Sequence, residues 1–166
     1  MSGESAAPTV GLLIRDNRLR EWGFPRWGSS AAAGLDLHAC LDEPLLLTPQ
    51  APPVLIAAGF SVLIRDPNWC GLVFPRSGLG HREGLVLGNG TGVIDADYEG
   101  PLMVSAWNRN ADPTATIVIH PGDRIAQLVF TRVTRPDFTI VDALDPDESE
   151  PPSGRGESGF GSTGRR

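Results

Sequence analysis

The chain contains 166 residues with a mass of 17.7 kDa, enough for one domain with a real core and too little for two. Its formal net charge of −6 argues against a nucleic-acid polymer or a membrane surface as partner, because such binding needs clustered cations. All 14 cationic residues are arginine, which excludes lysine chemistry such as a Schiff base or a P-loop phosphate site. Arginine remains well suited to bidentate contact with phosphate.

Short apolar runs separated by glycine, proline and aspartate recur along the chain, a pattern typical of many short strands. We expect strands over residues 10–15, 59–65, 70–74, 102–107, 116–120, 124–133 and 138–141. Twenty glycines and fifteen prolines leave room for one short helix only, around residues 77–83. The sequence therefore predicts an all-β sandwich or jelly-roll barrel.

Cysteine and histidine usage gives no sign of a metal centre or of an oxidising compartment. Cys40 and Cys70 form no close pair, and the three scattered histidines do not create a zinc-ligand spacing. No signal-peptide pattern and no apolar run of about 18 residues is found. We expect a soluble cytoplasmic protein with two reduced thiols and no membrane partner.

The most informative segment is residues 93–98, where two carboxylates alternate with apolar residues and the run ends at the only tyrosine. In a strand with period 2, Asp95 and Asp97 share one face and Tyr98 lies on the other, so the strand must turn if Asp95 and Tyr98 contact one ligand. Glycine-rich residues on both sides allow the backbone to approach a ligand closely. The alternative is an exposed hairpin with solvated acids and a half-buried tyrosine.

Two further segments carry arginine or polar side chains beside glycines. Residues 75–80 follow a predicted strand, and with Ser77 as a helix N-cap the backbone N–H groups of residues 77–80 would face an anion, although an ordinary strand-to-turn junction is the alternative. In residues 121–128, Asp123 and Arg124 are interpreted as a structural turn pair. Gln127 is polar within an apolar run and needs a hydrogen-bond partner.

The last part of the chain has a different composition from the rest. Residues 145–166 are rich in proline, glycine and charge, so they cannot build a core, and a disordered tail is the alternative to any function. Phe160 nevertheless lies among glycines with arginine before it and hydroxyls after it, as an arm that folds over a nucleotide would require. We predict a jelly-roll core domain over residues 1–144, and a flexible linker and mobile C-terminal arm over residues 145–166.

Five motifs in order carry a specific resemblance: AGLDLHA at residues 33–39, PRSGLG at 75–80, GNGTGVIDADYEG at 88–100, GDRIAQL at 122–128 and RGESGFGSTG at 155–164. Together they resemble the trimeric dUTP nucleotidohydrolases, or dUTPases, most closely the bacterial form. The resemblance implies a distorted β jelly-roll homotrimer whose three active sites lie between subunits. It also implies hydrolysis of dUTP to dUMP and pyrophosphate with Mg²⁺ as cofactor, which keeps uracil out of DNA and supplies dUMP for thymidylate synthesis.

The resemblance assigns a role to individual residues. Asp95 matches the carboxylate that activates the water attacking the α-phosphorus, and Asp36 matches an acid associated with the metal's water shell. Tyr98 corresponds to the ring under the deoxyribose, while Asn89 and a tight hairpin backbone read uracil and refuse thymine and cytosine. The nucleoside pocket is further lined by Val93, Ile94 and Met103. The phosphates are assigned to Arg76, Ser77, Gly78 and Gln127, and the closing arm to Arg155, Phe160, Ser162 and Thr163, with Phe160 stacked on uracil.

This sequence departs from the family pattern at Ser158, where the arm usually has a glycine, and in the segment 24–27. Two rival functions remain: dCTP deamination on the same fold, and a nucleotide-responsive binding module without hydrolysis. A deaminase needs its own acid and base near the nucleobase, for which we find no segment, and an inactive module would be expected to lose Asp95 or the arm. Incubation with dUTP or dCTP distinguishes all three.

Overall fold

The computed structural model describes residues 7–142, and within them the regular secondary structure is almost entirely β. The strands are β1 (Gly11–Ile14), β2 (Leu35–His38), β3 (Leu45–Leu47), β4 (Val54–Ala57), β5 (Phe60–Leu63), β6 (Trp69–Pro75), β7 (Leu85–Leu87), β8 (Gly92–Ile94), β9 (Met103–Asn108), β10 (Ile117–Ile119) and β11 (Arg124–Arg132). Two short helical segments accompany them, α1 (Arg18–Glu21) and the π-helical turn η1 (Leu79–Glu83). The all-β prediction is confirmed.

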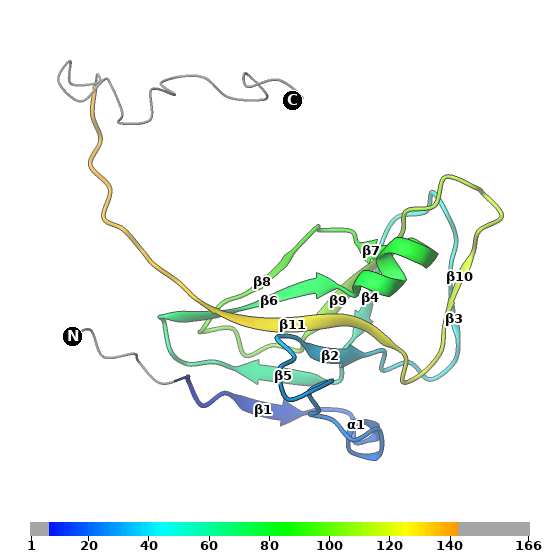
Figure 1. The fold of residues 1–166 in the computed structure, drawn as a ribbon, viewed down its shortest axis with the longest axis horizontal. Helices are drawn as coiled ribbons and strands as arrows, with labels where there is room; N and C mark the ends of the chain where they lie inside the picture. The colour runs from blue at the N-terminus through cyan, green and yellow to red at the C-terminus, as the bar shows by residue number, and fades with distance from the viewer. Residues whose placement is uncertain (1–6, 143–166) are drawn as a thin grey trace. The chain divides into compact units, whose positions relative to one another are not determined.

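The sheet that organises the molecule has the strand order β2-β11-β6-β8, and all its pairs are antiparallel. In Figure 1, β11 crosses the middle of the view between β6 and β2. Its nine residues pair with β6 along almost their whole length, from Ala126 opposite Pro75 to Arg132 opposite Trp69. On the other edge Gln127 lies opposite Asp36. The strand β11 therefore brings three of the family motifs into register.

A second sheet has the order β4-β9-β7, and β1 with β5 and β3 with β10 form two-stranded ladders. All four sheets contribute to one hydrophobic core, with Phe60 from β5, Leu37 from β2, Val104 from β9 and Ile119 from β10 among its fully buried side chains. Alternation along β2, β9 and β10 puts these residues inside and their neighbours in more exposed positions, whereas β5 is buried over Phe60, Ser61 and Val62.

Most of the expected strands form, with small shifts of their ends. The exception is residues 138–141, which pair with no strand among the described residues, and Phe138 and Ile140 are 88% and 94% exposed. Strand composition without a neighbouring edge leaves the backbone unpaired, so that prediction is wrong for the single chain. The sequence did not predict β2, β3, β4 or β7, which are only three or four residues long.

The helical turn expected around residues 77–83 forms as η1 and ends at Gly84, whose φ of 80° is the left-handed conformation that glycine adopts easily. The proposed capping role of Ser77 is not seen, because Gly78 precedes η1 and no side-chain capping bond is formed. The helix α1 was not predicted. No helix among the described residues is long and apolar enough to cross a membrane.

Two compact units divide at Thr134 and Arg135, so the described residues 7–134 form one unit and 135–142 belong to another. The proposed domain boundary at residue 144 stays a prediction.

Candidate active site

The segment with the two carboxylates forms a turn at the end of β8. The strand stops at Ile94, and the Tyr98 N–H donates to the Asp95 carbonyl at 3.2 Å. This turn breaks the period of two, so Asp95 and Tyr98 line the same pocket, of about 180 Å³, and Asp97 does not line it. The expectation that the two acids share a strand face is therefore wrong, and the turn required for one ligand to meet both Asp95 and Tyr98 is present.

The pocket beside this turn is open to solvent, and most of its lining residues are apolar. Its lining consists of Val93, Ile94, Asp95, Tyr98, Pro101, Leu102 and Met103. Tyr98 is 41% exposed and its hydroxyl donates to the Pro101 carbonyl at 3.0 Å, which fixes the ring at the rim. Four of the residues assigned to the nucleoside pocket, Val93, Ile94, Tyr98 and Met103, thus lie together with Asp95.

The remaining nucleoside residue, Asn89, lies in the connection between β7 and β8 and is not among the residues that line the pocket. This connection is not a hairpin, because β7 pairs with β9 and β8 pairs with β6, in different sheets. The turn is closed by the Gly90 N–H, which donates to the Leu87 carbonyl at 3.1 Å, and Gly90 has a φ of 73°. The prediction of a hairpin is wrong because glycine-rich turns also connect strands of separate sheets.

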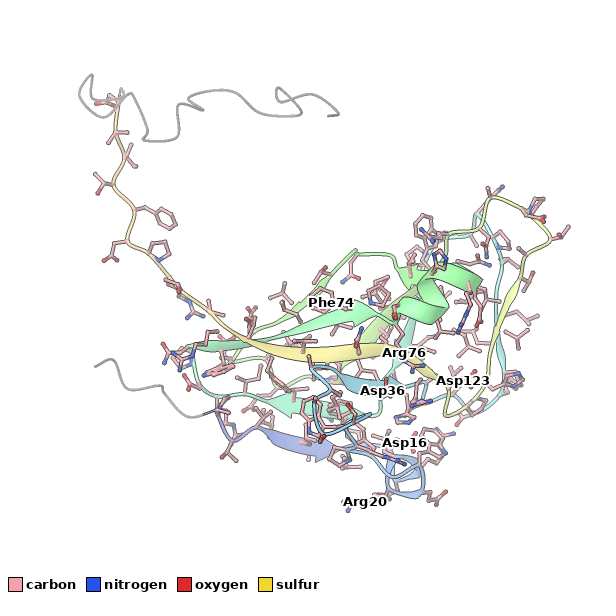
Figure 2. All side chains as sticks on the ribbon, in the orientation of Figure 1. Asp16, Arg20, Asp36, Phe74, Arg76 and Asp123 are labelled. Atoms are coloured by element: carbon pink, nitrogen blue, oxygen red, sulfur yellow. The ribbon has the colours of Figure 1, made fainter. Side chains whose placement is uncertain are left out.

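At the other end of β6, Asp36 lies between two arginines. Its Oδ1 forms an ion pair with the Nε of Arg76, and its Oδ2 accepts a hydrogen bond from the Nη1 of Arg124, both at 3.0 Å. Arg76 also donates from Nη1 to the Arg124 carbonyl at 3.1 Å. Figure 2 shows Asp36 and Arg76 side by side where β2 and β6 end near each other. Both carboxylate oxygens therefore lie beside guanidinium groups, which is unfavourable for direct binding of a metal ion, while an association with the metal through water stays a prediction.

A large cavity of about 730 Å³ opens beside this cluster. It is lined by Arg76, Ser77, Gly78 and Gln127, the four residues assigned to the phosphates, and by Asp36, Arg82 and Arg124 among others. Gln127 has the partner that its position requires, since its Nε2 donates to the Pro75 carbonyl at 3.0 Å. The backbone N–H of Gly80 is not free for an anion, because it donates to the Arg76 carbonyl at 2.9 Å.

Sequence reasoning missed the role of Arg124. Asp123 does close a turn, with its Oδ2 accepting from the His120 N–H at 2.7 Å, but Arg124 pairs with Asp36 rather than with Asp123. The two are 88 positions apart in sequence, and only the register between β2 and β11 brings them together. The only local feature that could have pointed to this role of Arg124 is its position as a charged residue at the start of a strand.

The imidazole of His38 lies next to this charged cluster. Its ring is tilted by 31° against the Trp22 ring at a centroid distance of 5.7 Å and lies edge-on to Phe24 at 6.3 Å, and its buried Nδ1 has no hydrogen-bond partner among the described residues. Burial lowers the pKa of His38, and the positive charges of Arg124 and Arg76 lower it further, while Asp36 raises it. The neutral imidazole is therefore the form that the fold favours.

The candidate site has two halves, the nucleoside half around Asp95 and Tyr98 and the phosphate half around Arg76. They lie at opposite ends of β6. Ile94 is paired with Gly71, whereas Arg76 follows the strand five residues later, or about 17 Å away at the usual rise of about 3.4 Å per residue. Neither of these two cavities contains residues of both halves. The four arm residues, Arg155, Phe160, Ser162 and Thr163, lie outside the described residues.

The comparison with known proteins agrees with the arrangement of these motifs. The dUTPase family model matches residues 20–164. The chain belongs to the dUTPase family. It is 48% identical to the deoxyuridine 5′-triphosphate nucleotidohydrolase of Tolumonas auensis, over 94% of this chain and 97% of that protein. It is 47% identical to the enzyme of the same name from Paraburkholderia phymatum, over 93% and 97%.

Solved dUTPase structures have the same fold. The dUTPase of Staphylococcus bacteriophage 80alpha, solved with dUpNHpp, superposes with a TM-score of 0.78 at 27% identity and covers 95% of this chain and 99% of that one. A dUTPase from phage phi11 of S. aureus, in which a structural Mg(II) ion is coordinated, gives a TM-score of 0.69 at 25% identity over 82% and 98%. The predicted jelly-roll β fold and the predicted dUTPase family are both confirmed, and the chain is therefore an enzyme.

Proposed function

We propose that this dUTPase hydrolyses dUTP to dUMP and pyrophosphate, with Asp95 as the general base for the attacking water. The observation that carries the proposal is the turn at residues 95–98, which gives Asp95 and Tyr98 one pocket. Asp95 is exposed there, so its carboxylate is accessible to water and to substrate. Positioned general-base assistance contributes ~10²–10⁴-fold to a hydrolysis rate.

In this proposal the Asp95 carboxylate accepts a proton from water as the oxygen attacks the α-phosphorus, and the bond to the bridging oxygen of pyrophosphate breaks. The Tyr98 ring packs against the deoxyribose and leaves no room for a 2′-hydroxyl. Val93, Ile94 and Met103 supply apolar surface to the nucleoside, and Asn89 contacts the polar edge of uracil. Discrimination by a ring that occupies the space of one hydroxyl is a steric effect, so it depends on how firmly the ring is held.

The triphosphate is proposed to lie against Arg76, Ser77, Gly78 and Gln127, and the arm to close over the substrate with Arg155, Phe160, Ser162 and Thr163. The net positive charge of the cavity supports the phosphate assignment, because Arg76, Arg82 and Arg124 face a single acid, Asp36. Closure of an arm would also exclude water other than the nucleophile from the reacting centre.

Magnesium fits this site as an ion that arrives with the triphosphate. No group of three or more histidine, cysteine, aspartate or glutamate side chains is found among residues 7–142, and Asp36 is held by two guanidinium groups. Mg²⁺ is commonly bound through one or two carboxylates, water and substrate phosphates, and when bound it neutralises charge on the phosphate oxygens. Asp95 is exposed and lines the nucleoside pocket, so its carboxylate would be accessible to the water shell of a bound Mg²⁺.

The homotrimer is part of the proposal, because a single chain presents the two halves of the site far apart. A substrate that needs both halves would lie between one copy's Asp95 pocket and another copy's Arg76 cavity. The outer face of the β4-β9-β7 sheet supports association, since Leu55, Met103 and Trp107 are 66%, 38% and 38% exposed on it. An apolar sheet face of this kind is typical of an interface.

In cells, the proposed reaction would keep uracil out of DNA and supply dUMP for thymidylate synthesis. The two free thiols, Cys40 and Cys70, suit the reducing environment of the cytoplasm.

Product analysis with dUTP, UTP, dTTP and dCTP side by side tests the function. We expect dUMP and pyrophosphate from dUTP and little turnover of the others. Asp95→Asn should retain dUTP binding and lose ~10²-fold or more in kcat. Ammonia release from dCTP, or binding of dUTP without turnover by the unchanged protein, would contradict the proposal.

A further inference from the structure

The turn that carries Asp95 and Tyr98 is held from behind by residues that do not line the pocket. Arg65 follows β5 and has a φ of 57°, in the left-handed region that residues other than glycine rarely adopt. In this conformation its N–H donates to the Ala96 carbonyl at 2.9 Å, inside the turn. Unusual backbone of this kind is a reason to look for a role near a functional site.

The side chains of two arginines converge on Glu99, the residue directly after Tyr98. Arg65 donates to Oε1 of Glu99 from Nη2 at 2.9 Å and from Nε at 3.2 Å. Arg15, at the end of β1, donates from Nη2 to the Glu99 carbonyl at 3.3 Å. Its Nε donates to the hydroxyl of Ser61 at 2.7 Å, and Ser61 is fully buried in β5. Both the backbone and the side chain of Glu99 are therefore tied to the β1-β5 ladder.

The position of Glu99 matters because the Tyr98 ring is fitted against the backbone that follows it. The Tyr98 hydroxyl reaches past Glu99 to the Pro101 carbonyl, and the ring lies so close to Gly100 that a Cβ at that position would overlap it. A shift of the backbone at Glu99 therefore moves the surface on which the ring rests. Tyr98 is 41% exposed and lines the nucleoside pocket, so the position of its ring determines the shape of that pocket.

We propose that Arg15, Arg65 and Glu99 form a clamp that holds the Tyr98 ring in place and thereby sets the preference for deoxyribose over ribose. These three are positioning residues, because none of them lines the nucleoside pocket. The inference rests on the proposed function for its substrate. It adds to that function the residues that keep the discriminating ring rigid.

The expected effect is modest, because the pair between Arg65 and Glu99 is 66% and 59% exposed at its two side chains. Exposed ion pairs contribute little each, so loss of this one should lower the ratio of kcat/KM for dUTP to that for UTP by about two- to fivefold. The change should come mainly from faster UTP turnover, since a mobile ring admits a 2′-hydroxyl. Thermal unfolding should move little.

The experiment compares Glu99→Ala and Arg65→Ala with a matched control, Asp42→Ala. Asp42 makes an exposed ion pair of similar length, 3.1 Å to Arg18, and does not line the nucleoside pocket. The charge-swapped variant Arg65→Glu/Glu99→Arg rebuilds the ion pair in reverse and should restore part of the lost discrimination. Loss in both single variants, none in Asp42→Ala and recovery in the swap are the expected results.

A second measurement does not depend on catalysis. Tyr98 is the only tyrosine of the chain, so incorporation of 3-fluorotyrosine gives one ¹⁹F resonance from the protein. We expect that resonance to shift or to change in width in Glu99→Ala and Arg65→Ala, and to stay unchanged in Asp42→Ala. If the unchanged protein does not hydrolyse dUTP, the proposed function fails while the ¹⁹F spectra still test the clamp.

An unchanged dUTP-to-UTP ratio together with an unchanged ¹⁹F resonance in both Glu99→Ala and Arg65→Ala would overturn the clamp. An equal fall of the ratio in Asp42→Ala would also overturn it, because the effect would then reflect the loss of any surface ion pair.

Discussion

The replacement Asp36→Asn separates two roles for this acid, the metal role that the family resemblance implies and the arginine-positioning role that the geometry favours. The side chain of Asp36 is 16% exposed, and each of its oxygens lies 3.0 Å from a guanidinium nitrogen. Asparagine keeps the shape but offers one acceptor in place of two and no charge. The remaining amide group would then face an arginine with its own N–H.

The size of the loss in stability follows from how exposed the Asp36 and arginine side chains are. Charge-assisted hydrogen bonds contribute more than neutral ones, but Arg124 is 53% exposed and its contribution must be discounted for solvent screening, which leaves about 1–2 kcal/mol for the whole change. For a chain of this size that corresponds to a fall in Tm of about 2–8 °C. Since Arg76 loses its anchor beside the phosphate cavity, KM for dUTP should rise by about three- to tenfold with a smaller change in kcat.

The assay is steady-state hydrolysis titrated separately with dUTP and with Mg²⁺, alongside thermal unfolding. Asp123→Asn is the control, because Asp123 lies nearby and closes a turn without contacting Arg76 (Figure 2). The positioning role predicts that excess dUTP restores the rate and that the Mg²⁺ midpoint stays where it was. Restoration of the rate by excess Mg²⁺ with an unchanged KM for dUTP would refute our reasoning and return Asp36 to the metal.

Two further predictions concern stability. Because burial and the nearby arginines lower the pKa of His38, the folded chain binds a proton at His38 less readily than the unfolded chain does. The free energy of unfolding should therefore fall as pH drops through about 6.5. Urea titrations at several pH values should show a shallower fall with pH in His38→Phe, and an equal dependence on pH in both proteins would contradict this. Asn108 is buried and donates to the carbonyls of Leu47 and Ala115 at 2.8 Å each, so Asn108→Ala should lower the free energy of unfolding by about 2–4 kcal/mol in urea, whereas the exposed Gln50→Ala should not.

The sequence predicted what depends on local pattern and missed what depends on pairing. Apolar alternation was enough to find β9 and β11, because those strands are long enough to show it. Residues 138–141 have the same composition, but a strand needs a neighbouring edge, which the described single chain does not provide. Composition therefore predicts the tendency to form a strand and not its partner.

The same distinction applies within the candidate site. The motifs predicted that Asp95 and Tyr98 act together, and the turn that unites them is local, closed by one hydrogen bond between the two residues. The ion pair between Asp36 and Arg124 and the contacts of Glu99 with Arg65 and Arg15 join positions 88, 34 and 84 residues apart. No local pattern encodes such contacts, since they arise only when the fold brings distant segments together. Positioning residues are for this reason harder to predict than residues that contact substrate.

If each site is built between copies, two inactive variants should restore each other. Asp95→Asn disables the nucleoside half and Arg76→Ala the phosphate half, and the two halves lie at opposite ends of β6. In a cyclic assembly formed at random from equal amounts, about a quarter of the interfaces combine an intact Asp95 with an intact Arg76 from the neighbour. Unfolding the two variants together and refolding them should therefore recover about a quarter of the activity of the unchanged enzyme.

The control for this experiment is refolding each variant alone, which should give no recovery. A site contained within one chain would contain at least one defect in every copy, whatever the mixture. If the mixture is only as active as the mean of the two separate variants, Asp95 and Arg76 act from the same chain. The shared-site proposal would then have to be abandoned. The assignment of Asp95 as the general base has its own test and would not be affected.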